Sequence, residues 1–129
     1  MEKRPIQGSV VEVKKGWGKE VIFAREPAYC GKLLCFNKRT KFSMHFHKNK
    51  DETFYVTEGT FQLNWIDTKD ATIHSEVLNV GDTGRVPPLL PHQVTCISNG
   101  GTIIEVSTHD NAEDEDNFRV GKGLSLIHI

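Results

Sequence analysis

Short runs in which apolar and polar residues alternate, separated by turn residues about every eight positions, are the feature that most limits how this chain can fold. Alternation with a period of two puts one kind of side chain on each face of a β-strand. With 129 residues the chain is large enough for one domain with its own hydrophobic core. We therefore predict an all-β sandwich or barrel of about ten strands, without a long helix. The expected strands include residues 9–13, 20–24, 31–36, 41–47, 52–58, 61–66, 71–78, 92–98 and 102–107.

Two histidines one residue apart, His45 and His47, precede a glutamate, Glu52. Alternate side chains of a strand share a face, so the two imidazoles should point the same way, roughly 6–7 Å apart along the strand. Glu52 follows the polar turn 48–51 and should begin the next strand, facing the same interior. These residues can bring three metal-binding atoms together. On these residues alone, a surface strand that happens to carry two histidines remains the alternative.

The other face of the expected strand 41–47 carries Phe42, Met44 and Phe46, opposite Ser43 and the histidines. Large apolar side chains on one face and histidines on the other indicate a strand that is covered on both faces. Either a second layer of the same chain or another subunit should cover the apolar face. This face also predicts a homodimer.

A second cluster begins at Gly81 and continues, after five residues, with Pro87 and, after four more, with His92. The prolines of this loop restrict the backbone just before His92. Imidazoles and a carboxylate suit divalent Fe, Mn, Zn, Ni or Co. Four protein ligands around an octahedral ion leave two positions open, as in a catalytic metal site. We predict one such ion, held by His45, His47, Glu52 and His92.

At these residues the chain resembles the cupin superfamily. The first cupin motif has a glycine, five residues, His-x-His, three or four residues, a glutamate, six residues and a glycine. The chain matches this spacing from His45 to Gly59, with Arg39 in the position of the leading glycine.

The second cupin motif has a glycine, five residues, Pro-x-Gly, two residues, a histidine, three residues and an asparagine. Gly81, Pro87 and His92 match, whereas Leu89 and Cys96 replace the glycine and the asparagine. The resemblance covers roughly residues 30–107. It implies a cupin-type double-stranded β-helix, that is, a jelly-roll barrel. All four metal-ligand positions of the family are filled by the expected residue types: His45, His47, Glu52 and His92.

Within the superfamily, the chain loosely resembles the cupin form of mannose-6-phosphate isomerase, in segments 16–18, 104–108 and 113–120. This resemblance implies a metal-dependent small-molecule enzyme that acts on a sugar or sugar phosphate and interconverts an aldose and a ketose. The metal would hold the oxygens at C1 and C2 while a base moves the proton. The residues do not identify the base.

A phosphate group would need cations at the mouth of the barrel, and Lys41, Arg85 and Arg119 are the candidates, although each is more often a surface charge. Two other functions remain open. One is a cupin-type Fe(II) dioxygenase, and the other is a non-catalytic cupin that binds a metal or a small ligand. His74 and His109 are expected to be solvated or hydrogen-bonded rather than ligands.

The formal net charge of −1 argues against nucleic acid as a partner. No apolar run approaches the roughly 20 residues of a membrane span, and no apolar stretch follows the charged residues 1–5 as in a secretory signal. The three cysteines are odd in number and form no CxxC pair, which indicates reduced thiols and a cytoplasmic protein.

We divide the chain into a flexible N-terminus at 1–8, the barrel at 9–108 and an acidic segment at 109–123, expected to be a solvated tail or one helical turn. Residues 124–129 look like the in-frame translation of a transposase adapter used in preparing sequencing libraries. We therefore expect native sequence to end near Gly123. Independent reads of the locus that encode the same six residues would contradict this.

Overall fold

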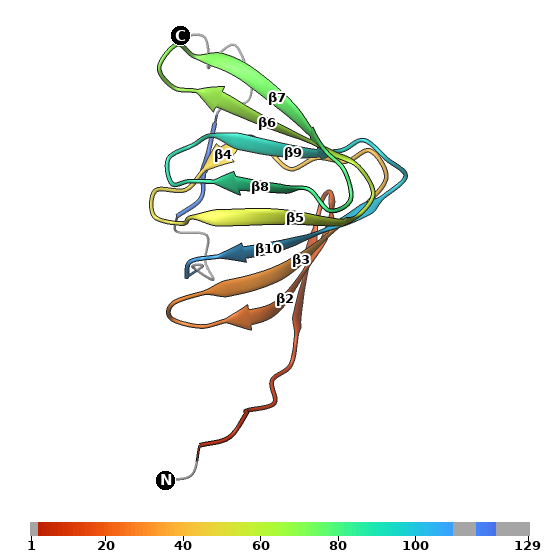
Figure 1. The fold of residues 1–129 in the computed structure, drawn as a ribbon, viewed down its shortest axis with the longest axis vertical. Helices are drawn as coiled ribbons and strands as arrows, with labels where there is room; N and C mark the ends of the chain where they lie inside the picture. The colour runs from red at the N-terminus through yellow and green to blue at the C-terminus, as the bar shows by residue number, and fades with distance from the viewer. Residues whose placement is uncertain (1–2, 110–115, 121–129) are drawn as a thin grey trace.

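Two antiparallel β-sheets make up the architecture of this computed structural model, which describes residues 3–109 and 116–120 (Figure 1). The six-stranded sheet contains, in spatial order, β1 (Val11–Lys15), β2 (Gly18–Arg25), β3 (Cys30–Phe36), β10 (Gly101–Ser107), β5 (Glu52–Glu58) and β8 (Thr83–Val86). The five-stranded sheet contains β11 (Phe118–Arg119), β4 (His45–Phe46), β9 (His92–Cys96), β6 (Phe61–Asp67) and β7 (Thr72–Leu78).

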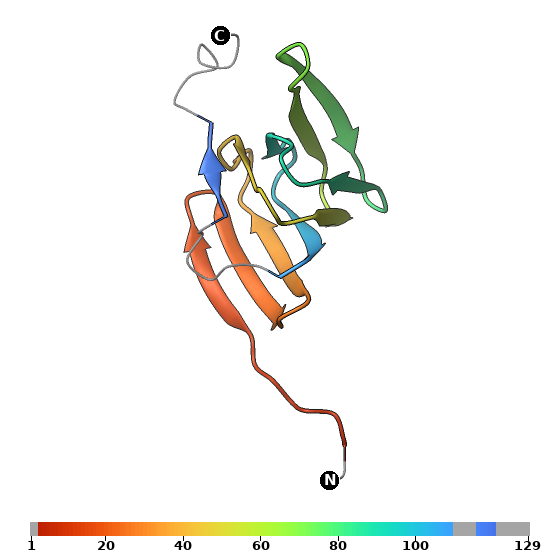
Figure 2. The same cartoon turned by 90° about the vertical axis from the view of Figure 1, so that its left-hand side faces the viewer.

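The chain crosses repeatedly between the two sheets, as in a jelly roll. The strands β3, β5, β8 and β10 lie in one sheet, whereas β4, β6, β7 and β9 lie in the other. In both views residues 3–10 extend away from the sheets (Figure 2). The described residues contain no helix, and therefore none that could cross a membrane. The predicted all-β cupin-type jelly roll is confirmed.

Alternation along the strands builds the core between the sheets. In β5 the side chains of Phe54 and Val56 are 1% and 0% exposed, whereas Tyr55 between them is 43% exposed on the outer face. At one end of the core Trp17 stacks on Phe36, with ring centroids 4.5 Å apart. This aromatic packing fills the space between the sheets on one side of the histidines.

Four positions of the two motifs have backbone conformations that favour glycine. Gly59 and Gly81 have φ angles of 83° and 93°, while Arg39 and Leu89, which stand at glycine positions of the motifs, have φ angles of 54° and 71°. The turns therefore keep the left-handed conformation even where a side chain makes it unfavourable.

The predicted strand 41–47 is wrong over most of its length, because only His45 and Phe46 form β4. The N–H of Phe42 donates to Val94 in β9, whereas the carbonyl of Met44 accepts from Val120 on the other side. In a regular strand residues two apart hydrogen-bond on the same side, so the change of partner between Phe42 and Met44 marks a break in the strand. As a result Phe42 lies 5.0 Å from His45, between ring centroids, rather than on the opposite face.

The expectation of a solvated tail or helical turn is wrong for residues 116–120. Phe118 pairs with Phe46 across β11 and β4, and their rings stack with centroids 5.3 Å apart. The covering layer predicted for Phe46 is therefore supplied by the same chain. The suspected adapter residues 124–129 lie outside the described residues.

Candidate metal centre

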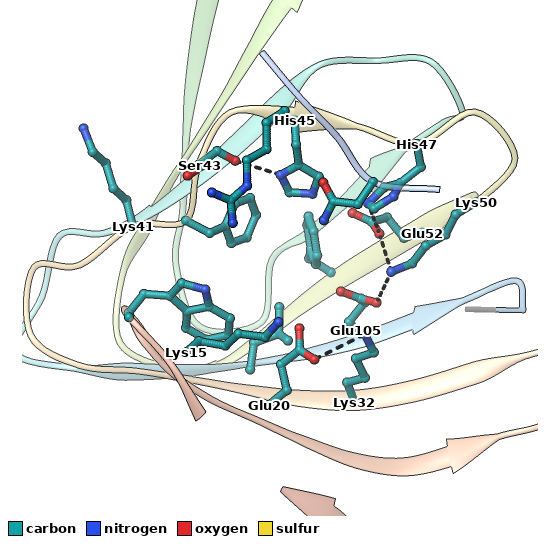
Figure 3. A pocket seen from close by; sticks show the side chains of 17 residues that line it. Lys15, Glu20, Lys32, Lys41, Ser43, His45, His47, Lys50, Glu52 and Glu105 are labelled. Atoms are coloured by element: carbon teal, nitrogen blue, oxygen red, sulfur yellow. Dashed lines mark hydrogen bonds and ion pairs between the residues drawn. The ribbon is translucent and has the colours of Figure 1, made fainter. Parts of the chain in front are cut away.

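The three histidines of the two motifs come together in the structure, and Figure 3 shows His45 and His47 side by side at the wall of a cavity. His45 in β4 pairs directly with His92, the first residue of β9, and His47 follows β4. One ligand atom from each of these imidazoles lies within 4.8 Å of the others, an arrangement that can hold a metal ion. The alternation of His45 and His47 and the restricted loop before His92 account for this convergence.

Each of the three imidazoles is fixed by a backbone carbonyl through its Nδ1 atom. Because a carbonyl oxygen only accepts hydrogen bonds, Nδ1 must carry the hydrogen, and Nε2 keeps a lone pair. This is the orientation that metal-binding histidines usually have. The bonds run from His45 to Ser43 at 2.7 Å, from His47 to Asp116 at 2.7 Å and from His92 to Leu90 at 2.9 Å.

Glu52, the first residue of β5, lies among these Nε2 atoms and is only 2% exposed. Its Oε1 lies 2.9 Å from Nε2 of His92, and its Oε2 lies 3.7 Å from Nε2 of His47. A lone pair and a carboxylate oxygen repel one another at such distances unless a proton or a cation lies between them. Nε2 of His92 is buried and has no hydrogen-bond partner among the described residues. The three histidines can therefore hold a divalent cation, and the carboxylate of Glu52 lies beside two of them.

Electrostatics favour the metal-binding protonation states. Burial, assisted by the nearby His92, lowers the pKa of His45 from 6.5 to about 3, and burial also lowers the pKa of His47. Burial alone would raise the pKa of Glu52, but the proton or cation that its contact with His92 requires and the charge of Lys50 outweigh burial, so this pKa lies below its usual value. Near neutral pH the imidazoles of His45 and His47 are therefore neutral and the carboxylate of Glu52 is ionised.

A cavity of about 320 Å³ opens beside the site, and its walls differ in chemistry (Figure 3). Aromatic side chains form one part of the lining. Charged side chains from the inner face of the six-stranded sheet form another. The aromatic residues are Trp17, Phe42 and Phe54, and the charged residues beyond the candidate ligands are Lys15, Glu20, Lys32, Lys41, Lys50, Glu105 and Arg119.

Several of these charges are buried and paired. Nζ of Lys50 lies 3.1 Å from Oε2 of Glu105, and Nζ of Lys32 lies 3.4 Å from Oε1 of Glu20. Burial, with the nearby charge of Glu52, raises the pKa of Glu105. Our sequence reading missed this group, although Lys32 alternates in phase with the inward-facing Leu34.

Two of the three basic residues that we expected to bind a phosphate group lie at the cavity. Lys41 and Arg119 line the cavity. Arg85 does not, and its guanidinium instead forms two hydrogen bonds to Asp51, at 3.1 and 2.7 Å.

The remaining histidines lie outside the cavity lining. Nδ1 of His109 lies 2.9 Å from the carbonyl of Glu26. His74 stacks on Trp65 and belongs, with Asp67 and Asp70, to an exposed group in the β6–β7 hairpin. The Asp70 carboxylate already accepts hydrogen bonds from the N–H and hydroxyl of Thr72.

Comparisons with known proteins place the chain in a family. The family model described as Cupin matches residues 32–126, so the chain belongs to the cupin family. No curated protein matches the chain.

Solved structures share the fold at low sequence identity. The capsular polysaccharide assembling protein CapF from Staphylococcus aureus has a TM-score of 0.75 and 12% identity, over 90% of this chain and 34% of that one. A variant of B. subtilis oxalate decarboxylase has a TM-score of 0.76 and 14% identity, over 92% of this chain and 34% of that one. KdgF from Halomonas sp. has a TM-score of 0.68 and 18% identity, over 82% and 90%. The chain thus spans about a third of the first two proteins and most of the third.

Proposed function

We propose that this cupin is a metal-dependent enzyme that acts on a sugar or a sugar phosphate, most simply as an aldose–ketose isomerase. One divalent transition metal would be held by His45, His47, Glu52 and His92. The main support for the metal site is that the Nδ1 atoms of all three histidines donate hydrogen bonds to backbone carbonyls. Their Nε2 lone pairs are therefore available to a metal ion, near the buried carboxylate of Glu52. When bound, the ion would supply a Lewis acid for two oxygens of the substrate.

The cavity supports a carbohydrate as the ligand. A sugar has apolar C–H faces that pack on aromatic rings and hydroxyl groups that hydrogen-bond to charged side chains. Trp17 and Phe42 supply the rings, whereas Glu20, Lys32 and Glu105 supply polar partners. Lys41 and Arg119 would hold the phosphate of a phosphorylated substrate. One structural neighbour is named for capsular polysaccharide assembly, but our assignment rests on the cavity.

An isomerase assay under anaerobic conditions tests this function. The metal-loaded chain is incubated with aldose phosphates such as mannose 6-phosphate, and oxygen uptake is measured separately in air. We expect isomerisation without oxygen, lost in His92→Ala and retained in His74→Ala, a histidine that does not belong to the group formed by His45, His47 and His92. Turnover that requires oxygen would instead support a dioxygenase, and isomerisation that survives His92→Ala would contradict the proposed site.

We also propose that the protein works in the cytoplasm. Cys35 and Cys96 are free thiols, and Cys96 is buried. Reduced thiols are typical of cytoplasmic proteins. Cell fractionation tests this, and recovery of the protein outside the cell would contradict it.

A further inference from the structure

The ammonium group of Lys50 lies inside the cavity, against one of the candidate metal ligands (Figure 3). Its Nζ is 3.2 Å from Oε2 of Glu52 and 3.1 Å from Oε2 of Glu105. The whole residue is only 6% exposed. A positive charge is therefore fixed at the edge of the candidate metal site, in the wall of the cavity that opens beside it.

The position of Lys50 is not the one that its place in the sequence predicts. It lies in the short turn between β4 and β5, from which a lysine normally reaches solvent. Lys48 in the same turn does so: it is exposed, with its Nζ 4.7 Å from the centroid of the Phe118 ring. Burying an ammonium is costly, and a buried ion pair seldom adds net stability. The burial of Lys50 therefore indicates a role in the cavity.

We propose that Lys50 determines the ligand class of the site. Its ammonium pairs with a charged oxygen of the ligand, so that the metal-loaded cavity prefers small anionic oxygen ligands, such as hydroxy acids, over neutral ligands of the same shape. The contacts with Glu52 and Glu105 hold the ammonium in place. This inference rests on the proposed metal-binding function and adds a residue that reads the charge of the substrate.

Two probes of equal shape and different charge test the proposal. Glycolate and glycolamide each offer a hydroxyl and a carbonyl oxygen, but only glycolate is an anion. Their binding to the full chain loaded with Co²⁺ is measured by calorimetry and by the cobalt absorption spectrum. We expect Lys50→Met to weaken glycolate binding by roughly tenfold or more while glycolamide binding stays within about twofold. Lys50→Arg should restore most of the glycolate affinity, and the control Lys48→Met should change neither ligand.

The other outcomes separate the two proposals. Glycolate binding that is unchanged in Lys50→Met, or lost in parallel with glycolamide binding, overturns the role of Lys50 and leaves the metal site standing. A wild-type chain that takes up no Co²⁺ overturns the proposed function and this inference together. If Lys50→Met does not fold or does not bind Co²⁺, Lys50→Gln gives the same comparison with the hydrogen bonds to the carboxylates retained. Loss of Co²⁺ in both variants shows that Lys50 belongs to the metal site itself and overturns its role in selectivity.

Discussion

Single hydrogen bonds decide what the three imidazoles can bind. Each Nδ1 atom donates to a carbonyl fixed by the fold, those of Ser43, Leu90 and Asp116. The ring orientation is therefore set before any ligand arrives, and the metal site is preorganised at the scale of individual residues. Because of the same hydrogen bonds, a proton and a metal ion compete for the Nε2 atom of each ring and not for Nδ1.

The depressed pKa values of His45 and His47 predict how the metal responds to acid. Protons and metal compete for the same Nε2 lone pairs, and a lower pKa means weaker competition from protons. We therefore expect the bound ion to be retained well below pH 6.5, the usual pKa of histidine. A pH titration of the Co²⁺-loaded chain, followed by absorption, measures this. Release with a midpoint near or above pH 6.5 would contradict the assigned environment.

Leu89 predicts a gain of stability on substitution. Its φ of 71° lies in the left-handed region, and its side chain is 60% exposed, so little burial would be lost. Leu89→Gly should raise the free energy of unfolding by up to about 1 kcal/mol, since glycine adopts this conformation without steric strain. Leu89→Ala retains the strain and is the matched control. Denaturant unfolding compares them, and equal stabilities of the glycine and alanine variants would disprove strain at this turn.

At the scale of elements, the segment that leads into the short strand β11 holds the turn between two candidate ligands. The carboxylate of Asp116, just before β11, accepts hydrogen bonds from the N–H groups of Lys48, Asn49 and Lys50, at 2.7, 3.0 and 3.0 Å. These bonds outweigh the effect of burial and lower the pKa of Asp116. Because this turn connects His47 to Glu52, the C-terminal segment holds two candidate ligands in place.

Asp116→Ala should therefore affect stability and metal binding together. We expect a loss of about 1–2 kcal/mol in the free energy of unfolding, from the hydrogen bonds to the turn. We also expect roughly tenfold weaker Co²⁺ binding, because groups that orient ligands typically matter to that extent. Asp70→Ala removes a similar carboxylate from the distant β6–β7 hairpin and should leave Co²⁺ binding unchanged. Unaltered metal affinity in Asp116→Ala would mean that the hydrogen bonds between Asp116 and the turn do not position the ligands.

Some elements were predictable from local pattern and some were not. Alternation correctly predicted that Phe54 and Val56 of β5 face the core, because β5 is a continuous strand with the core on one side. The same alternation failed at Phe42, since the segment changes partner between β9 and residue 120. β11 could not be predicted, because it depends on a pairing with β4 more than 70 positions away along the chain.

At the scale of the whole molecule, the described residues leave an apolar surface uncovered on the outer face of the six-stranded sheet. Val21, Leu33, Ile104 and Tyr55 are successive partners across four strands of the six-stranded sheet, so their side chains share its outer face. Val106, on the same strand and face as Ile104, is 53% exposed. This face, rather than the one formed by Phe46, is where we expect a second copy of the chain to pack.

Light scattering during gel filtration tests the expected homodimer. At micromolar concentration the wild-type chain should have the mass of a dimer. Tyr55→Lys should shift the mass toward that of the monomer, because it places a charge on the face that would be buried between the two copies. The control Val80→Lys, at a 62% exposed position in the turn between β7 and β8, should leave the mass unchanged. A monodisperse wild-type monomer would contradict this assembly.

The overall fold and the clustering of the three histidines were predictable for a common reason. Both depend on local patterns, namely short alternating strands and two motifs of fixed spacing, with His45 and His92 brought together by direct strand pairing. The charged wall of the cavity was not predictable, because Glu20, Lys32 and Glu105 meet only when distant strands pair. We propose that the substrate contacts this wall, so its chemistry could be inferred only from the structure.

The metal content of the purified chain tests the central claim most directly. Elemental analysis after purification without chelators should find one divalent transition metal ion per chain. His45→Ala and His92→Ala should lose it, whereas His74→Ala and His109→Ala, at histidines outside the group formed by His45, His47 and His92, should keep it. A wild-type chain without stoichiometric metal, or variants at His45 and His92 that retain it, would contradict the proposed metal centre.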